Sequence, residues 1–187
     1  MPVEHRQPPY SIEPFDSANH DRAAFGCGSS RVDNYLRLTA KKQQRNDHAR
    51  IWVAVPAGQT LIAGFYAVAA YGIRAQELSE EAARQAPNHG MIPVIYLSVL
   101  GVDTQHQGKG LGDALLTDAL ERALMVSDNI GVAAVILDVL DDGGEAAIER
   151  RTRFYHAQKF QQFPSMPMRM FLMLATARAA FGRSADR

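Results

Sequence analysis

The residues that could do chemistry are concentrated in one glycine-rich stretch, Gln105-His106-Gln107-Gly108-Lys109-Gly110-Leu111-Gly112. Three glycines within five positions let the backbone approach a ligand closely and turn its amide N–H groups toward it. If a helix begins at these glycines, its unpaired N–H groups and its dipole favour an anion at the same point. The stretch therefore predicts a site for a phosphate or pyrophosphate group.

The segments on either side of the glycines fit that prediction. Residues 92–102 are apolar and carry no charge, which is typical of a strand buried on both faces of a sheet. From 111 to 124, leucine and alanine recur at helical spacing, with charged residues on the other side. The glycines therefore join a strand to the N-terminus of a helix.

Two better-known phosphate loops do not fit these residues. A Walker A loop needs G-x-x-x-x-G-K-[ST], but Gly108-Lys109 is followed by Gly110, and Asp103 stands five positions before Gly108. A dinucleotide fingerprint needs G-x-G-x-x-G, whereas the spacing here is G-x-G-x-G. The remaining alternative is a helix N-terminus whose glycines serve only packing.

The pattern Q-x-x-G-x-G from Gln105 to Gly110 resembles motif A of the GNAT superfamily of acyl-CoA-dependent N-acyltransferases. Phe154-Tyr155 stands about where that family carries its F-Y pair, so the resemblance covers most of the chain. It implies an α/β (α+β) fold: a mixed, mostly antiparallel central sheet of six to seven strands, splayed at the central strand and flanked by helices. It also implies acetyl-CoA as the co-substrate.

The resemblance assigns roles to individual residues. Leu100 and Val102 fall on the splayed strand, whose backbone amides hold the thioester arm, and Lys109 is a peripheral charge at the pyrophosphate. Tyr155 is the candidate general acid near the departing sulfur, worth no more than roughly 10² to 10⁴ in rate; the alternative is a tyrosine packed on the cofactor. The implied cofactor-binding set is Leu100, Val102, Gln107, Gly108, Lys109, Gly110, Leu111 and Gly112.

The strands expected to border the reaction lack a carboxylate. Many enzymes of this family that act on strongly basic amines place one there, but residues 94–102 and 61–70 contain none, and Asp138 at the end of a later strand is the one exception. A lysine ε-amine with a pKa of about 10.4 must be deprotonated, whereas an α-amine near 7.7 is already partly neutral. The missing base therefore favours a weakly basic amine as acceptor.

A longer frame resembles the GNAT toxins of bacterial toxin–antitoxin modules, which acetylate the α-amine of aminoacyl-tRNA. It consists of Phe25, residues 29–36, Gly64-Phe65-Tyr66 and residues 101–112. Such an acceptor fits the missing base. Arg37, Lys41 and Arg45 recur at i, i+4 and i+8 and so share one helical face, with Lys42 beside them. The phosphates of tRNA would fit this basic face. The alternative is that the face is an ordinary solvated surface. An antitoxin protein is then a further expected partner.

Two features depart from that family. Lys159 stands where the family's F-Y-x-x-x-G-F pattern has a C-cap glycine. A lysine that keeps the left-handed conformation at this position costs roughly 1 kcal/mol in stability. Residues 142–153 look longer than the toxins' corresponding turn and add a charged helical extension. Two other functions therefore stay open: a small-molecule or protein amine acetyltransferase without a toxin role, and a CoA-binding module without turnover.

Composition favours one domain over residues 1–187, with a loose lead at about 1–9 and a frayed tail at about 176–187. The chain has 187 residues, 47% of them hydrophobic, and twenty basic residues balance twenty acidic ones, so nucleic-acid binding needs a local patch. The lone Cys27 excludes an internal disulfide and suggests a reducing, cytoplasmic compartment. No apolar run reaches transmembrane length, so no membrane partner is expected. A homodimer is left open.

Methionines recur from 166 to 173, but no cysteine or histidine accompanies them, so they predict core packing and no metal site. The remaining elements follow from apolar periodicity and turn residues. We expect strands at 10–15, 49–55, 61–70, 133–140, 160–163 and 168–174, helices at 31–45 (capped by Ser29 or Ser30), 145–157 and from 175, a helical turn at 79–85 and a loop at 87–90.

Overall fold

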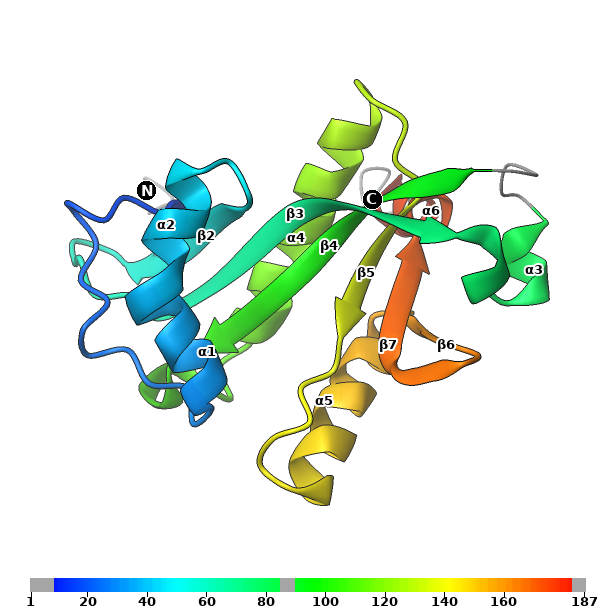
Figure 1. The fold of residues 1–187 in the computed structure, drawn as a ribbon. Coiled ribbons are helices and arrows are strands. Elements are labelled where there is room, and N and C mark those ends of the chain that lie inside the picture. The colour runs from blue at the N-terminus through cyan, green and yellow to red at the C-terminus, as the bar shows by residue number, and fades with distance from the viewer. Residues whose placement is uncertain (1–8, 85–89, 183–187) are drawn as a thin grey trace, which may run out of the picture. The chain divides into compact units, whose positions relative to one another are not determined.

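The computed structural model describes residues 9–84 and 90–182 (Figure 1). The chain forms two compact units, one from Met1–Ala67 and Leu100–Leu116 and the other from Val68–Val99 and Thr117–Arg187. Two long strands, β3 (Gly64–Arg74) and β4 (Met91–Val102), run through both units. The sheet has the strand order β1-β2-β3-β4-β5-β7-β6, which confirms the predicted mixed, mostly antiparallel sheet.

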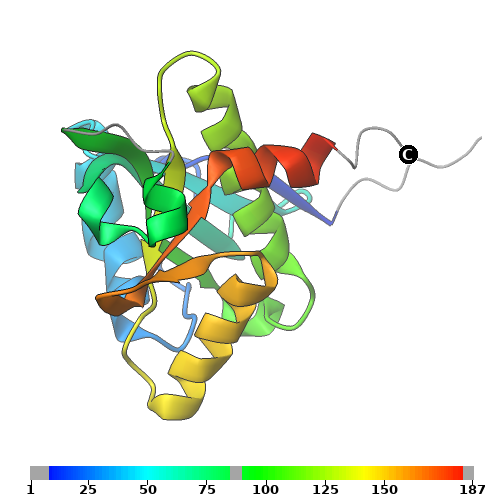
Figure 2. The same ribbon diagram turned by 90° about the vertical axis from the view of Figure 1, so that its right-hand side faces the viewer.

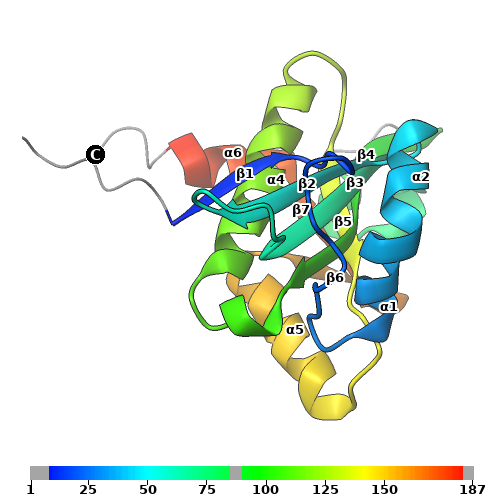
Figure 3. The same ribbon diagram turned by 90° about the vertical axis from the view of Figure 1, so that its left-hand side faces the viewer.

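The first unit pairs β1 (Tyr10–Pro14) antiparallel with β2 (Arg50–Pro56). Its helical stretch consists of α1 (Ser30–Asn34), the π-helical turn η1 (Tyr35–Thr39) and α2 (Ala40–Arg45), and Figure 3 shows α2 beside β2. The Ser29 hydroxyl caps α1 by accepting the Val32 amide. We predicted one regular helix here. The π turn adds a residue to the turn and so changes the angular spacing between Arg37 and Lys41.

Glycines allow close packing in the first unit. A Cβ built on Gly101 would lie 2.6 Å from the Val32 side chain, and one on Gly64 would lie 2.8 Å from Leu115. Both distances are shorter than real Cβ contacts, so any larger residue would push these elements apart. The glycines therefore let the end of β4 and the start of β3 approach α1 and the first turns of α4 (Leu111–Ser127).

In the second unit, two strands pair in parallel. β4 pairs with β5 (Ala134–Asp138) from Val94–Ala134 to Leu97–Leu137, and β4 then continues to Val102 without that partner. This end of the ladder is where the family resemblance predicts the splay. On its other edge β5 pairs antiparallel with β7 (Met166–Met173), which pairs with β6 (Gln161–Phe163).

The second unit's helices are α5 (Glu145–Ala157) and α6 (Leu174–Gly182), with the short η2 (Ala75–Glu77) and α3 (Glu80–Ala83). Figure 2 shows the β6–β7 hairpin following the end of α5 and leading into α6. Buried side chains from five strands and from the loop before α3 form its core: Ile73, Leu78, Ile92, Val94, Ala134, Ile136, Phe163 and Phe171. No helix among residues 9–84 and 90–182 is both long and apolar enough to cross a bilayer.

Several predicted boundaries are wrong by a few residues. Strand β3 starts at Gly64 and not at Leu61, which forms only an isolated bridge to Asp21. It extends to Arg74, four residues beyond the predicted end of the strand at residue 70. The expected loose lead (except residue 9), most of the loop at 87–90 and the frayed residues 183–187 lie outside the described residues.

Candidate functional site: a glycine loop, a tyrosine helix and a basic face

The glycine loop joins η3 (Thr104–His106) to α4, as the sequence predicts. Gly108 and Gly110 have φ values of +72° and +79°, a region that side-chain-bearing residues rarely adopt. A Cβ built on either glycine would meet nothing within 4 Å. The glycines therefore do not make room for the protein's own atoms. They turn the backbone and leave open space beside it, which disfavours the packing alternative and fits a bound pyrophosphate.

Side chains hold this loop from both sides. The Asp103 carboxylate accepts the Gln105 amide through one oxygen and the Gly26 amide through the other, each at 2.9 Å. The Gln107 side-chain amide donates to the carbonyls of Cys27 (3.0 Å) and Val102 (2.9 Å). Gln107 therefore has only its backbone left for a phosphate. We did not predict the role of Asp103, although an aspartate directly before a helical turn is a recognisable capping signal.

The other predicted cofactor residues lie next to this loop. Leu111 is 2% exposed and starts α4, so it anchors the helix N-terminus in the first unit's core. Lys109 is exposed, and its ammonium donates to the Gln105 carbonyl at 2.8 Å, which agrees with a peripheral charge. Leu100 and Val102 are partly buried on β4, beyond its ladder with β5. The structure thus brings the predicted set together.

Tyr155 belongs to the second unit, in the last turn of α5. That helix ends in a Schellman motif, because the Phe160 amide donates to the Tyr155 carbonyl (3.1 Å) and the Lys159 amide to the His156 carbonyl (2.9 Å). Lys159 has a φ of +71°, so the left-handed conformation is kept despite the lysine. The Phe160 ring packs edge-on against Tyr155 at 5.9 Å. Burial raises the pKa of Tyr155 to about 12, so its hydroxyl is protonated at neutral pH.

Asp138, the one carboxylate on β3, β4 or β5, is fully engaged. It accepts two hydrogen bonds from the Arg169 guanidinium and one from the Tyr96 hydroxyl, all at 2.8 Å. The bond to Arg169 is the main cause of a lowered Asp138 pKa, and Tyr96 adds to it. A carboxylate that holds its charge this strongly is a poor proton acceptor, so Asp138 does not supply the missing base.

The basic residues of the helical stretch differ in their surroundings. Arg37 is partly buried: its guanidinium donates to the Phe25 carbonyl and lies 3.9 Å from the Asp33 carboxylate. Lys41, Lys42 and Arg45 are exposed on α2. Lys41 and Arg45 line a groove between α2 and the end of β1. The exposed charge of this face therefore comes from α2, while Arg37 also ties the helix to the chain before it.

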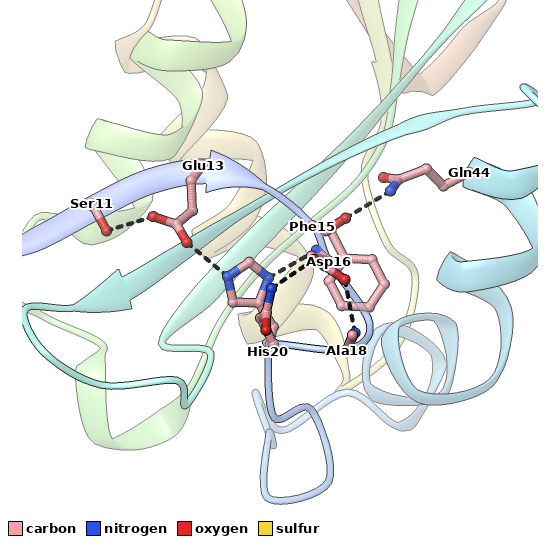
Figure 4. Close-up of polar contacts among 8 residues, drawn as sticks. Ser11, Glu13, Phe15, Asp16, Ala18, His20 and Gln44 are labelled. Atoms are coloured by element: carbon pink, nitrogen blue, oxygen red, sulfur yellow. Dashed lines mark hydrogen bonds and ion pairs between the residues drawn. The ribbon is translucent and has the colours of Figure 1, made fainter.

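Figure 4 shows how α2 is fixed at that groove. Gln44 donates to the Phe15 carbonyl at 2.7 Å. It also accepts the Ile51 amide at 3.3 Å. Below it, His20 Nδ1 accepts the Asp16 amide (2.9 Å), so Nε2 carries the proton and donates to Glu13 (2.8 Å). Both ring nitrogens are used within the protein, so this His–Glu pair holds the loop and is not arranged for acid–base chemistry.

The thiol of Cys27 is not activated, because burial raises its pKa to about 12. Within the described ranges, no three side chains among histidine, cysteine, aspartate and glutamate form a group that could hold a metal ion.

Comparison with known proteins assigns this architecture to a family. Residues 19–160 match the Acetyltransferase (GNAT) family, and the chain belongs to it. It is 44% identical over 171 residues to a protein of Sinorhizobium fredii (strain NBRC 101917 / NGR234) named "Probable toxin TacT", covering 91% of this chain and 94% of the relative. It is 33% identical over 162 residues to a "tRNA-acetylating toxin" of Mycobacterium tuberculosis, covering 87% and 91%.

Solved structures support the same fold. A crystal structure of a KacT variant superposes with a TM-score of 0.83 at 19% identity, covering 92% of this chain and 99% of the other. AtaT in complex with acetyl-methionyl-tRNAfMet gives 0.81 at 20% identity, with the same coverage. AtaT bound to acetyl-CoA and the C-terminus of the antitoxin AtaR gives 0.76 at 18% identity, covering 93% and 99%. The predicted GNAT fold and acetyltransferase class are thus confirmed.

Proposed function

We propose that the chain transfers the acetyl group of acetyl-CoA to the α-amine of an aminoacyl-tRNA, and that it is the toxin of a bacterial toxin–antitoxin module. The observation that carries the proposal is the engagement of Asp138 by Arg169 and Tyr96. With that carboxylate unavailable, β3, β4 and β5 offer no general base, so the acceptor must arrive with a largely neutral amine. An α-amine activated by its neighbouring ester meets that requirement. The relative named "tRNA-acetylating toxin" supports a tRNA acceptor, and the one named "Probable toxin TacT" supports a toxin role.

The proposed reaction uses the residues described above as follows. The backbone amides from Gln107 to Gly112 bind the pyrophosphate of the co-substrate, and those of Leu100 and Val102 hold its thioester arm. The amine nitrogen attacks the carbonyl carbon, a C–N bond forms, the C–S bond breaks, and the proton lost from nitrogen ends on sulfur. Tyr155 assists by donating a hydrogen bond to the departing sulfur.

The high pKa of Tyr155 limits that assistance. A phenol with a pKa of about 12 does not release its proton outright to a thiolate whose conjugate thiol has a pKa near 8.5. Its hydroxyl therefore acts chiefly as a hydrogen-bond donor to the sulfur as charge develops there. A contribution at or below roughly 10² to 10⁴ in rate fits such a role.

The exposed cations of α2 supply the proposed tRNA contact. Lys41, Lys42 and Arg45 carry their charges into solvent, where phosphates can reach them. As a toxin, the chain would also bind an antitoxin protein, as AtaT does with AtaR. Charged tRNA is a cytoplasmic molecule, so we propose a cytoplasmic location.

The acceptor can be tested directly. Radiolabelled acetyl-CoA is incubated with the protein and aminoacyl-tRNA, deacylated tRNA, free lysine or simple primary amines, with acetyl-CoA alone as the blank. We expect label only on aminoacyl-tRNA, released as an N-acetyl amino acid when mild alkali hydrolyses the ester. Label on small amines but not on tRNA would replace this proposal by the small-amine alternative. Tight CoA binding without any turnover would favour the binding module.

A further inference from the structure

A row of polar side chains crosses four neighbouring strands in the second unit. Its members are Tyr71 on β3, Tyr96 on β4, Asp138 on β5 and Arg169 on β7. Asp138 and Arg169 are direct partners in the β5–β7 register, and their side chains form the two-bond ion pair described above. The Tyr96 hydroxyl adds a third bond to the same carboxylate. These three bonds fix the Tyr96, Asp138 and Arg169 side chains relative to one another.

The row ends in an exposed ring. Tyr71 is 47% exposed, more than any other Phe, Trp or Tyr side chain whose exposure the structure describes. The guanidinium carbon of Arg169 lies 5.8 Å from its ring centroid, and the Tyr96 ring lies 5.6 Å away at 45°. Tyr71 is thus held by two anchored neighbours while much of its surface stays open to solvent.

The charges of the row indicate what this ring would bind. Arg169 has its Nε and one terminal nitrogen on Asp138, so its charge is balanced within the row and is not offered to a phosphate. An exposed tyrosine ring held in place by its neighbours is instead a platform on which a flat, uncharged ring can stack.

We propose that Tyr71, backed by Arg169, is a stacking site for a nucleobase from the unpaired 3′ end of the acceptor tRNA. This inference rests on the proposed function, because it assumes a nucleic-acid acceptor. Unpaired bases expose both faces, and proteins bind them by stacking them on aromatic side chains. The site adds contact with bases to the phosphate contacts of α2.

The test is a mutant cycle between the ring and individual bases. Affinity for deacylated tRNA is measured by fluorescence anisotropy with CoA present, using intact tRNA and tRNAs made abasic at each unpaired 3′ nucleotide in turn. Stacking of one base contributes about 1–3 kcal/mol, which corresponds to about 5- to 150-fold in affinity. We expect Tyr71→Leu and Tyr71→Val to weaken the binding of intact tRNA by that factor. Tyr71→Phe keeps the ring and should bind within about twofold of the wild type.

The decisive comparison is between removing one base from the tRNA and replacing the Tyr71 ring with leucine. At one nucleotide, removing the base should weaken wild-type binding but have no further effect in Tyr71→Leu. If every base removal costs the same in both proteins, or if Tyr71→Leu binds like the wild type, the stacking site is wrong although tRNA binding stands. If the wild-type protein binds no tRNA, the proposed function and this site fail together. Met125→Ala, which alters another exposed apolar side chain on α4, is the control expected to change nothing.

Discussion

The Arg169 guanidinium donates two parallel hydrogen bonds to the Asp138 carboxylate, Nε to Oδ1 and Nη2 to Oδ2, both 2.8 Å long. Such bidentate pairs are among the stronger charge-assisted contacts in proteins. The pair holds the Asp138 pKa below its ordinary value. It therefore removes the only carboxylate on the strands β3 to β5 from proton transfer, and the acceptor's own pKa must govern the reaction at neutral pH.

The pH dependence of transfer follows from this pair. We expect kcat/KM to rise with the titration of the acceptor's α-amine, near or below about pH 7.7, and to stay flat above it. Because burial raises the pKa of Tyr155 to about 12, its ionisation should not lower the rate anywhere below about pH 11. A stopped assay of tRNA acetylation from pH 5.5 to 9.5 measures this. A second inflection within this range that disappears in Asp138→Asn would mean that Asp138 acts as a base.

Tyr155→Phe tests the chemical role of the hydroxyl. We expect the free energy of unfolding to change by less than about 1 kcal/mol, because the ring contacts with Phe154 and Phe160 are kept. The affinity for acetyl-CoA should be nearly unchanged while kcat falls by roughly 10- to 10⁴-fold. Single-turnover kinetics and calorimetry separate these quantities. A normal rate for the chemical step would assign Tyr155 to packing.

Gly110→Asp tests the pyrophosphate loop. The side chain would enter the space beside the loop and place an anion near the phosphates, so acetyl-CoA affinity measured by calorimetry should fall by at least about tenfold. Gly58→Asp is a matched control: Gly58 has a φ of +74° and equally open space, but it lies in the turn after β2. Both variants should lose similar stability, and only Gly110→Asp should lose affinity. Equal acetyl-CoA affinities in the two folded variants would show that the glycine loop does not bind the pyrophosphate.

Charge reversal on α2 tests the tRNA contact. Replacing Lys41, Lys42 and Arg45 with Glu should abolish transfer to tRNA and spare acetyl-CoA binding. Wild-type tRNA binding should weaken steeply with salt, by roughly 0.7 to 0.9 in log K against log salt per phosphate contact. Arg37 is left unchanged because its bond to the Phe25 carbonyl makes Arg37→Glu a stability variant. Transfer insensitive to both salt and charge reversal would contradict a tRNA acceptor.

Lys159→Gly tests the strain at the end of α5. Glycine accepts the φ of +71° without a Cβ penalty, so we expect the protein to gain about 1 kcal/mol in the free energy of unfolding. Gln158→Gly, one residue earlier at a φ of −89°, should instead destabilise it. Urea denaturation measures both. A loss of stability in Lys159→Gly would show that the lysine side chain makes a contact that outweighs the strain.

The parts of the fold that could be predicted from the sequence are those with local signals. The strand β4, the glycine turn and the start of α4 follow from apolar runs and glycine spacing, and α5 has the bounds 145–157 that its periodicity predicts. The π turn at Tyr35–Thr39 has no such signal, because a regular helix accommodates the same residues. The pairing of Asp138 with Arg169 depends on the register between β5 and β7, which a single sequence does not contain.

Two hydrogen bonds, one from the Gln107 side-chain amide to the Cys27 carbonyl and one from the Gly26 amide to the Asp103 carboxylate, also affect how the two substrates bind. These bonds join the glycine loop to the segment that leads through Ser29 into α1 and on to the cations of α2. A ligand that stiffens the loop also stiffens this segment. The second ligand then does not have to lose the entropy of ordering this segment, so we expect the two substrates to bind with positive cooperativity without any change of fold.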